Sequence, residues 1–231
     1  TINTIGGVGG NGDGSTTPTG GLGGDAGLYI ISSLDITLDN ITLTGNSADG
    51  GNGYATVSNG YSGSGGLLYF YLNSTKISIY NTSYIMTSGS SGSSSSSASC
   101  SGDGTQHRHI TGGTGGNFII YVNTYNLTNS NVNIDVDMGS GGNAAASTCC
   151  SAHCTSNAAD AKGGSSGVLN ATIISNVNSG ENFNITVDAS TSGNCAATSY
   201  GSGATATEGT HGLNNTVFIN SSLTSFLLNI K

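Results

Sequence analysis

The segment Asn131-Val132-Asn133-Ile134-Asp135-Val136-Asp137 returns as Asn182-Phe183-Asn184-Ile185-Thr186-Val187-Asp188, and the offset is 182 − 131 = 51 residues. In both copies apolar residues alternate with polar ones, which is typical of a β-strand with one buried and one wet face. The same offset separates Gly116 from Gly167, and each of these glycines opens an apolar stretch. Two landmarks with one offset indicate an internal repeat of about fifty residues.

The repeat divides the chain, read as a single repetitive domain over 1–231, into apolar modules and Gly/Ser-rich excursions. The modules are expected at about 27–45, 66–88, 116–138, 167–189 and 212–231. The excursions between them are expected at about 6–26, 46–65, 89–115, 139–166 and 190–211.

This organisation predicts an all-β fold. A module of roughly 20 residues has room for three short strands and two corners. Because the same residue types recur at corresponding places, we expect a parallel β-helix of about five rungs, with the excursions leaving from one corner. The alternative is a β-sandwich of antiparallel hairpins. In the β-helix the excursions would lie side by side and hydrogen-bond through their backbones, as polyproline-II-like chains.

The composition excludes several classes of function. Charged residues make up 7% of the 231 residues, with four basic residues against twelve acidic ones. Nucleic acids and anionic membrane surfaces both require basic side chains, so neither is expected as a partner. No apolar run approaches the roughly 18–20 residues that span a bilayer, so no membrane span is expected. The chain starts at Thr1 without a signal segment, which we interpret as a processed secreted protein or part of a longer one.

The stretch Asn40-Ile41-Thr42-Leu43-Thr44-Gly45-Asn46-Ser47-Ala48-Asp49-Gly50-Gly51 resembles the repeats of adhesin-like surface proteins. These include archaeal adhesin-like proteins and bacterial polymorphic outer-membrane proteins, whose repeats place Asn-Ser-Ala shortly before Gly-Gly and an apolar strand. The resemblance implies a right-handed parallel β-helix, display at the cell surface, and an adhesive or structural role. It covers this stretch once, and no functional residue is carried over from it.

An enzyme is not expected. Hydrolysis of a glycosidic bond usually needs two facing carboxylates, and a lyase needs a base and a cation. The only arginine, Arg108, lies in a loop region, and neither G-x-S-x-G nor H-E-x-x-H occurs. A carbohydrate-active enzyme on a β-helix is therefore only the second alternative to a structural role.

Eight N-x-S/T sequons all lie in the strand modules or their corners. We expect glycans on some of them, and the alternative is that these amides stack and hydrogen-bond at the corners. The candidate residues are Asn40, Asn73, Asn81, Asn126, Asn170, Asn184, Asn214 and Asn220.

Five cysteines lie in the excursions, which suits an oxidising, extracellular compartment. We expect disulfides between neighbouring excursions, pairing Cys100 with Cys149 or Cys150, and Cys154 or the remaining vicinal cysteine with Cys195. One cysteine is then left free or pairs outside the chain. The alternative is a metal site that combines the cysteines with His107, His109 and His153.

Two aspartates should lie in adjacent rungs, because Asp137 and Asp188 are 51 residues apart. With Asp135 nearby, a bridging calcium ion is one interpretation, and solvated surface charges are the other. No other cofactor is expected.

The favoured function is a structural subunit of an extracellular filament, sheath or cell-surface fibre, glycosylated and self-associating head to tail. Apolar strand-like residues near both ends of the sequence are the candidate contacts: Thr1, Ile2, Ile5, Phe226, Leu227, Leu228 and Ile230. The first alternative is an adhesin or glycan-binding surface module. It would be favoured by an outward aromatic patch built from Tyr29, Tyr69, Tyr71, Tyr121 and Tyr125.

Overall fold

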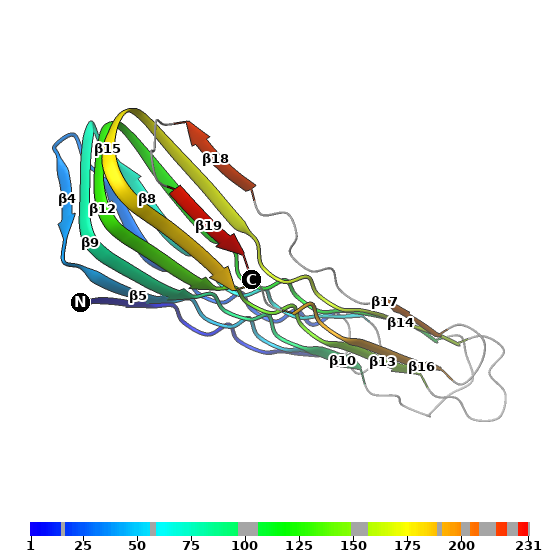
Figure 1. The fold of residues 1–231 in the computed structure, drawn as a ribbon. Coiled ribbons are helices and arrows are strands. Elements are labelled where there is room, and N and C mark those ends of the chain that lie inside the picture. The colour runs from blue at the N-terminus through cyan, green and yellow to red at the C-terminus, as the bar shows by residue number, and fades with distance from the viewer. Residues whose placement is uncertain are drawn as a thin grey trace.

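The chain forms a wide body from which a narrow arm extends (Figure 1). The computed structural model describes residues 1–14, 17–55, 59–96, 106–148, 157–188, 191–199, 204–207, 216–220 and 226–230. These residues form strands and connecting segments without any helix, and every strand pair among them is parallel. The antiparallel hairpins of a β-sandwich are therefore not found in the described chain.

The body is one ten-stranded parallel sheet that curves until it nearly closes into a barrel-like shape. Its two longest strands pair from Phe118 opposite Leu169 to Asp137 opposite Asp188, which is the offset of the sequence repeat. The strands of the body are β1 (Ile2–Ile5), β3 (Ala26–Ile31), β4 (Ile36–Asp39), β5 (Thr42–Asn46), β8 (Leu68–Asn73), β9 (Lys76–Thr87), β12 (Phe118–Asp137), β15 (Leu169–Asp188), β18 (Thr216–Asn220) and β19 (Phe226–Ile230).

Parallel register brings like residues together inside the body. One inward column runs through Leu43, Tyr84, Ile134 and Ile185, each at most 1% exposed. Burying one large apolar side chain contributes about 1.5–3 kcal/mol. Alternation of apolar and polar residues thus becomes a continuous core, because each strand places its apolar face over that of its neighbour.

The corners of the body are marked by asparagines with left-handed backbone. The φ angles of Asn40, Asn81, Asn131 and Asn182 are 51°, 43°, 52° and 56°. Asparagine tolerates this region better than other residues with a Cβ. The amides also form a ladder, in which Asn131 Nδ2 donates to Asn81 Oδ1 at 3.2 Å and Asn182 Nδ2 donates to Asn131 Oδ1 at 3.4 Å.

The arm contains two further parallel sheets, which the sequence analysis did not anticipate. Their strands are built largely from Gly, Ala and Ser, residues with weak strand preference. Ile110, Ala144, Ala146 and Ala161 form a small core in the arm. One sheet comprises β2 (Gly12–Gly14), β6 (Gly53–Ala55), β10 (Ser94–Ser96), β13 (Ala144–Thr148) and β16 (Cys195–Ser199), and the other comprises β7 (Gly60–Tyr61), β11 (Gln106–Thr111), β14 (Asn157–Lys162) and β17 (Ala204–Thr207).

Glycine-rich segments connect the body to the arm in two layers, one outgoing and one returning. Their backbone hydrogen bonds repeat every three residues. Gly50 donates to the Ser90 carbonyl of the next outgoing segment at 2.9 Å, and Gly51 donates across the layers to the Gly21 carbonyl at 2.8 Å. A period of three is that of a polyproline II helix, so the expected backbone bonding between excursions is present in these segments.

Of every three successive N–H groups in these segments, one donates within its layer, one donates across the layers, and the third often donates to a side chain. Asn52 N–H donates to Asn11 Oδ1 at 3.0 Å, and Ser93 N–H donates to Asn52 Oδ1 at 2.8 Å. Asp49 Oδ1 accepts from Ser90 N–H in the same way. These side-chain bonds are exposed and add to the backbone bonds between neighbouring segments.

Candidate functional site

One end of the stack exposes a group of apolar side chains. β1 pairs only with β5, and β3 only with β8, among the described strands, so this end has no covering strand there. Ile5, Val8, Leu22 and Leu34 are 73–79% exposed. The group, called here the end face, consists of Ile2, Ile5, Val8, Leu22, Tyr29, Ile31 and Leu34.

Val8 and Leu22 depart from the pattern of the later glycine segments. The backbone bonds place Val8 in one column with Asp49, Ser90 and Ser140, and Leu22 in another column with Ser64, Thr114 and Ser165. Every later member of both columns is polar. Apolar residues at these two outward positions occur only in the first segments, and the columns were the sequence signal that could have identified them.

The backbone polarity of this end differs from that of the opposite end. Within each layer the earlier segment donates to the later one, as Gly9 N–H does to the Asp49 carbonyl at 3.0 Å and Gly23 N–H to the Ser64 carbonyl at 3.0 Å. By the same register the end face presents acceptor carbonyls, including those of Val8 and Leu22. The opposite end presents donors such as the N–H of Ser192, which is equivalent to Gly141. The two ends are complementary in hydrogen bonding.

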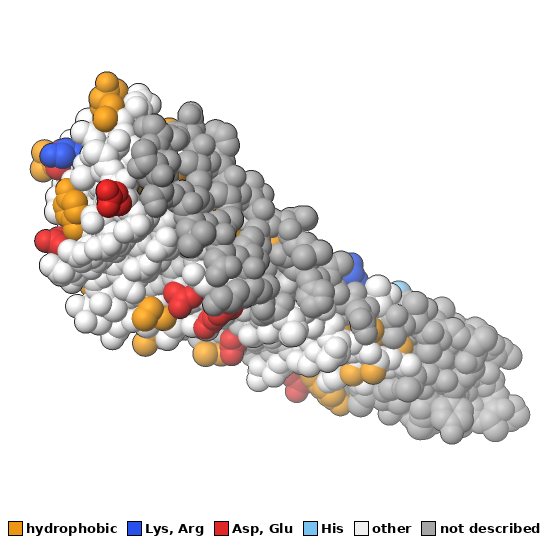
Figure 2. All heavy atoms as spheres, viewed as in Figure 1, with side chains coloured by type: hydrophobic (Ala, Val, Ile, Leu, Met, Phe, Trp, Pro, Cys, Tyr) orange, Lys and Arg blue, Asp and Glu red, His pale blue; other side chains and the backbone are white. Residues whose placement is uncertain are grey.

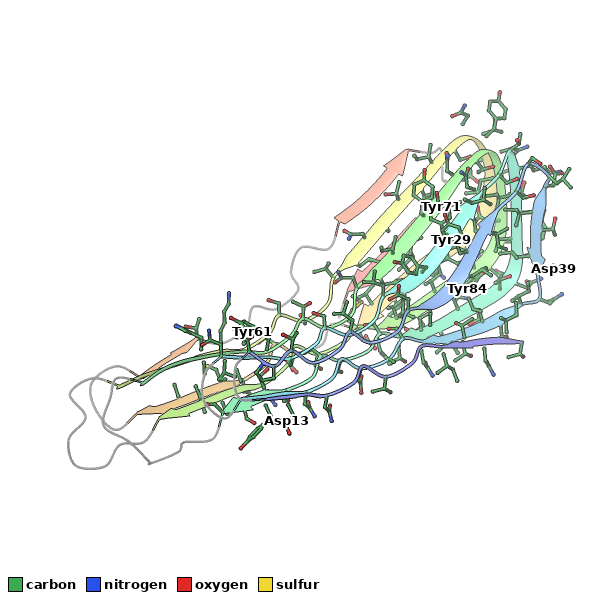
Figure 3. The ribbon with its side chains drawn as sticks, turned by 180° about the vertical axis from the view of Figure 1, so that it is seen from behind. Asp13, Tyr29, Asp39, Tyr61, Tyr71 and Tyr84 are labelled. Carbon is green, nitrogen blue, oxygen red and sulfur yellow. The ribbon has the colours of Figure 1, made fainter. Side chains whose placement is uncertain are left out.

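A ladder of tyrosines reaches the end face. The ring centroids of Tyr29 and Tyr71 are 4.4 Å apart at an interplanar angle of 19°, and those of Tyr71 and Tyr121 are 4.6 Å apart at 13°. Figure 3 shows Tyr29 and Tyr71 side by side. Desolvation between its neighbours raises the pKa of Tyr71. The Tyr29 side chain is 62% exposed, so the ladder ends in a ring with one open face.

Beyond Tyr121 the register continues through Thr172 to Phe218. The last described strand in this column therefore also carries an aromatic residue at the ladder position.

A hollow of about 320 Å³ lies beside Tyr29. Two of its polar side chains hold the backbone around it, since Thr4 Oγ1 accepts from Gly27 N–H at 3.0 Å and Asp25 Oδ1 accepts from Leu67 N–H at 2.8 Å. Desolvation and the Asp25 carboxylate raise the pKa of Tyr69. The hollow is lined by Thr4, Ile5, Asp25, Ala26, Gly27, Tyr29 and Tyr69.

The segments expected to mediate assembly are paired on one side within their own chain. Ile2–Ile5 lies against Leu43–Asn46 of β5, and Phe226–Ile230 lies against Phe183–Val187 of β15. Thr1 precedes β1 and is exposed. Strand addition from Thr1 to Ile5 would therefore have to use the outer edge of β1.

The sequons are placed differently from one another. Asn40, Asn81 and Asn170 are exposed, whereas Asn73, Asn126 and Asn184 are half-buried. Asn184 Nδ2 donates to Asn133 Oδ1 at 3.0 Å, and Asn73 Oδ1 accepts from Asn123. Asn214 lies outside the described residues, and only the backbone of Asn220 is described.

The predicted disulfides cannot be traced, because Cys100, Cys149, Cys150 and Cys154 lie outside the described residues, as does His153. Cys195 is a half-buried free thiol in β16. Its register partner in the neighbouring strand is Ala144, rather than Cys149 or Cys150. The connection from β13 to β14 is longer than that from β16 to β17, so cysteines of neighbouring excursions need not lie opposite one another.

The remaining candidates are spread along the body and arm. Asp137 and Asp188 are direct neighbours, whereas Asp135 faces Thr186 and Ile85. His109 is exposed, and only the backbone of His107 is described. No group of three or more His, Cys, Asp or Glu side chains suited to a metal ion occurs among the described residues. Calcium binding stays a prediction.

Charged side chains are sparse on the surface, as Figure 2 shows for one side of the molecule. In the described part of the chain, no helix has the length and apolar character required to cross a membrane. Comparison with protein-family models, curated proteins and solved structures finds no match to this chain.

Proposed function

We propose that the chain is a structural subunit of an extracellular filament, sheath or cell-surface fibre. It is folded as a right-handed parallel β-helix of about five rungs and associates head to tail. In this assembly the end face of one subunit packs on the opposite end of the next. A heterologous contact of this kind that does not close into a ring produces a filament.

The main observation in support of head-to-tail assembly is the exposed apolar end face. Its apolar side chains, of which four are 73–79% exposed, favour association, because burial of apolar surface is the main driving force, and the uncovered edges of β1 and β3 can accept a further strand. The complementary donors and acceptors at the two ends favour stacking in one orientation. The open face of the Tyr29 ring, which is 62% exposed, would be buried in the junction as well.

Extracellular localisation and N-linked glycosylation belong to the same proposal. The exposed sequon residues Asn40, Asn81 and Asn170 are the best-placed acceptors, since a glycan must project into solvent. Intact-mass measurement of natively purified protein before and after deglycosylation tests this part. A single mass of 22.8 kDa in both samples would contradict it.

The assembly is tested with Leu22→Asp and Ile5→Asp, which place a charge in the proposed junction. Electron microscopy and sedimentation should show filaments for the unaltered protein and short particles for both variants. Val177→Asp is the matched control, because Val177 is 45% exposed but lies outside the end face. Filaments of normal length in both end-face variants, or a monomeric unaltered protein at high concentration, would refute the proposal.

A surface module that recognises glycans is the second candidate. The stacked tyrosines favour it, since flat aromatic surfaces pack against apolar faces of ligands. Binding of soluble oligosaccharides by a non-assembling variant such as Leu22→Asp would support this candidate independently of assembly.

A further inference from the structure

A groove lies on the side of the body, at a corner one strand in from the end-face residues Ile31 and Leu34. Its volume is about 350 Å³, within the range of about 300–1,000 Å³ typical of ligand sites. The lining residues come from β8, β12 and β15, which all lie inside the sheet, and from the connection that follows β8. The groove is lined by Asn73, Ser74, Thr75, Asn123, Thr124, Tyr125, Ile174 and Asn176.

The corner that supports the groove is held by one carbonyl. The Thr75 carbonyl accepts from Thr124 Oγ1 at 3.0 Å, from Tyr125 N–H at 3.1 Å and from Asn126 N–H at 3.1 Å. Ser74 and Thr124 are buried. The backbone at Tyr125 is therefore fixed, although its side chain points outward and is 60% exposed.

Two amides in the groove share one hydrogen bond. Asn123 Nδ2 donates to Asn73 Oδ1 at 3.3 Å, which leaves Asn73 Nδ2 to donate and Asn123 Oδ1 to accept. The residue opposite Asn73 on β3 is Ile31, and the residue opposite Asn123 on β15 is Ile174. The row of amides therefore consists of these two asparagines alone. A ligand with adjacent hydroxyl groups can accept from one amide and donate to the other.

The ring of Tyr125 adds an apolar surface beside these amides. No stacking partner is found for it among the described aromatic rings. Ile174 gives the groove a second apolar contact. None of the lining residues carries a charge, and the adjacent Lys76 is paired with Asp35 at 3.6 Å. The groove therefore matches a neutral molecule with a hydroxyl-bearing edge and an apolar face.

We propose that this groove binds a neutral sugar ring, with its C–H face on Tyr125 and neighbouring hydroxyls on Asn73 Nδ2 and Asn123 Oδ1. The site lies on the side of the stack, beside the end-face residues Ile31 and Leu34. Asn73 is then a ligand-binding amide and remains unmodified, although it heads a sequon. In a filament the groove would recur once per subunit, which strengthens attachment to a polymeric glycan through multivalency.

Saturation-transfer NMR tests the proposal, using glucose, galactose, mannose and N-acetylglucosamine, with glucuronic acid as the charged comparison. At least one neutral sugar should bind. Tyr125→Ala should weaken that binding by about fivefold to tenfold, as loss of aromatic stacking predicts, and Tyr125→Trp should retain it. Asn123→Ala should also weaken it. Tyr54→Ala is the matched control, because Tyr54 is an exposed tyrosine in the arm.

Four outcomes would overturn the proposal: no neutral sugar binds, glucuronic acid binds equally well, Tyr125→Ala binds as the unaltered protein does, or a glycan is attached to Asn73. Circular dichroism of each variant shows whether the fold is retained. None of these measurements depends on assembly, so failure of the sugar site and failure of the filament proposal remain distinguishable.

Discussion

Substitution of Gly142 by alanine tests whether the glycine segments act as a close-packed structural layer. Gly142 lies in an outgoing segment between earlier and later neighbours. A Cβ added there would overlap the backbone carbonyl of Gly92 and lie 3.1 Å from Gly113 N. Gly142 N–H donates to the Gly113 carbonyl at 3.0 Å, and its own carbonyl accepts from Gly164 N–H at 2.9 Å. Separation of the segments would break both bonds.

The expected destabilisation follows from these contacts. Each lost backbone bond costs about 0.5–1.5 kcal/mol, and overpacking costs about 1–3 kcal/mol. We therefore expect Gly142→Ala to lower the free energy of unfolding by about 2–6 kcal/mol. Ala48, which is 8% exposed, shows that one methyl group fits in the second outgoing segment.

Gly10→Ala is the matched control, because Gly10 occupies the equivalent position in the first outgoing segment. A Cβ at Gly10 meets no atom within 4 Å. Alanine at an unstrained glycine position stabilises by about 0.4–1 kcal/mol through the unfolded chain. Urea unfolding followed by circular dichroism, at a concentration below assembly, compares the two variants. If Gly142→Ala were as stable as Gly10→Ala, the segments would not be packed as described.

Three further predictions concern the body. Tyr84→Phe should raise the free energy of unfolding by about 1 kcal/mol, because the Tyr84 hydroxyl is buried and has no hydrogen-bond partner among the described residues; an unchanged or lower urea midpoint would indicate a partner elsewhere in the chain. Burial also raises the pKa of Tyr84, because it disfavours the charged phenolate. Below the unfolded-state pKa of about 10, Tyr84 is protonated in both states and the free energy of unfolding does not depend on its titration; as the pH rises further, the unfolded chain ionises first and this free energy falls. Alkaline unfolding should therefore begin at lower pH than in Tyr84→Phe. Asn131→Ala should cost about 1–2 kcal/mol because φ is positive there, and Asn131→Gly should recover most of that loss; equal costs for both would assign the effect to the amide ladder instead.

Some residues of the candidate sites could also be predicted from the sequence. The tyrosines near the module openings were recognised, and Tyr29, Tyr71 and Tyr121 do stack on one another. The amide groove was missed, because Asn73 and Asn123 become neighbours only when two strands 50 residues apart pair in register. Ile2 and Ile5 of the end face were predicted as assembly contacts, whereas its apolar residues in the glycine segments were missed for the same reason. Val8 and Leu22 stand out only when each is compared with its polar equivalents in later segments.

The sequence alone determined that the body is all-β and that its repeat is about fifty residues long, because alternation and offset are properties of the chain read linearly. The offset of 51 is the register in which β12 and β15 pair. Only the tertiary structure decided how the glycine-rich excursions are ordered. Glycine has no side-chain pattern to read, and those segments are held by backbone bonds between residues far apart in the chain, such as Gly193 N–H to the Gly164 carbonyl. The position of Cys195 opposite Ala144 was likewise set by this packing, since loop lengths displace equivalent residues without changing the composition.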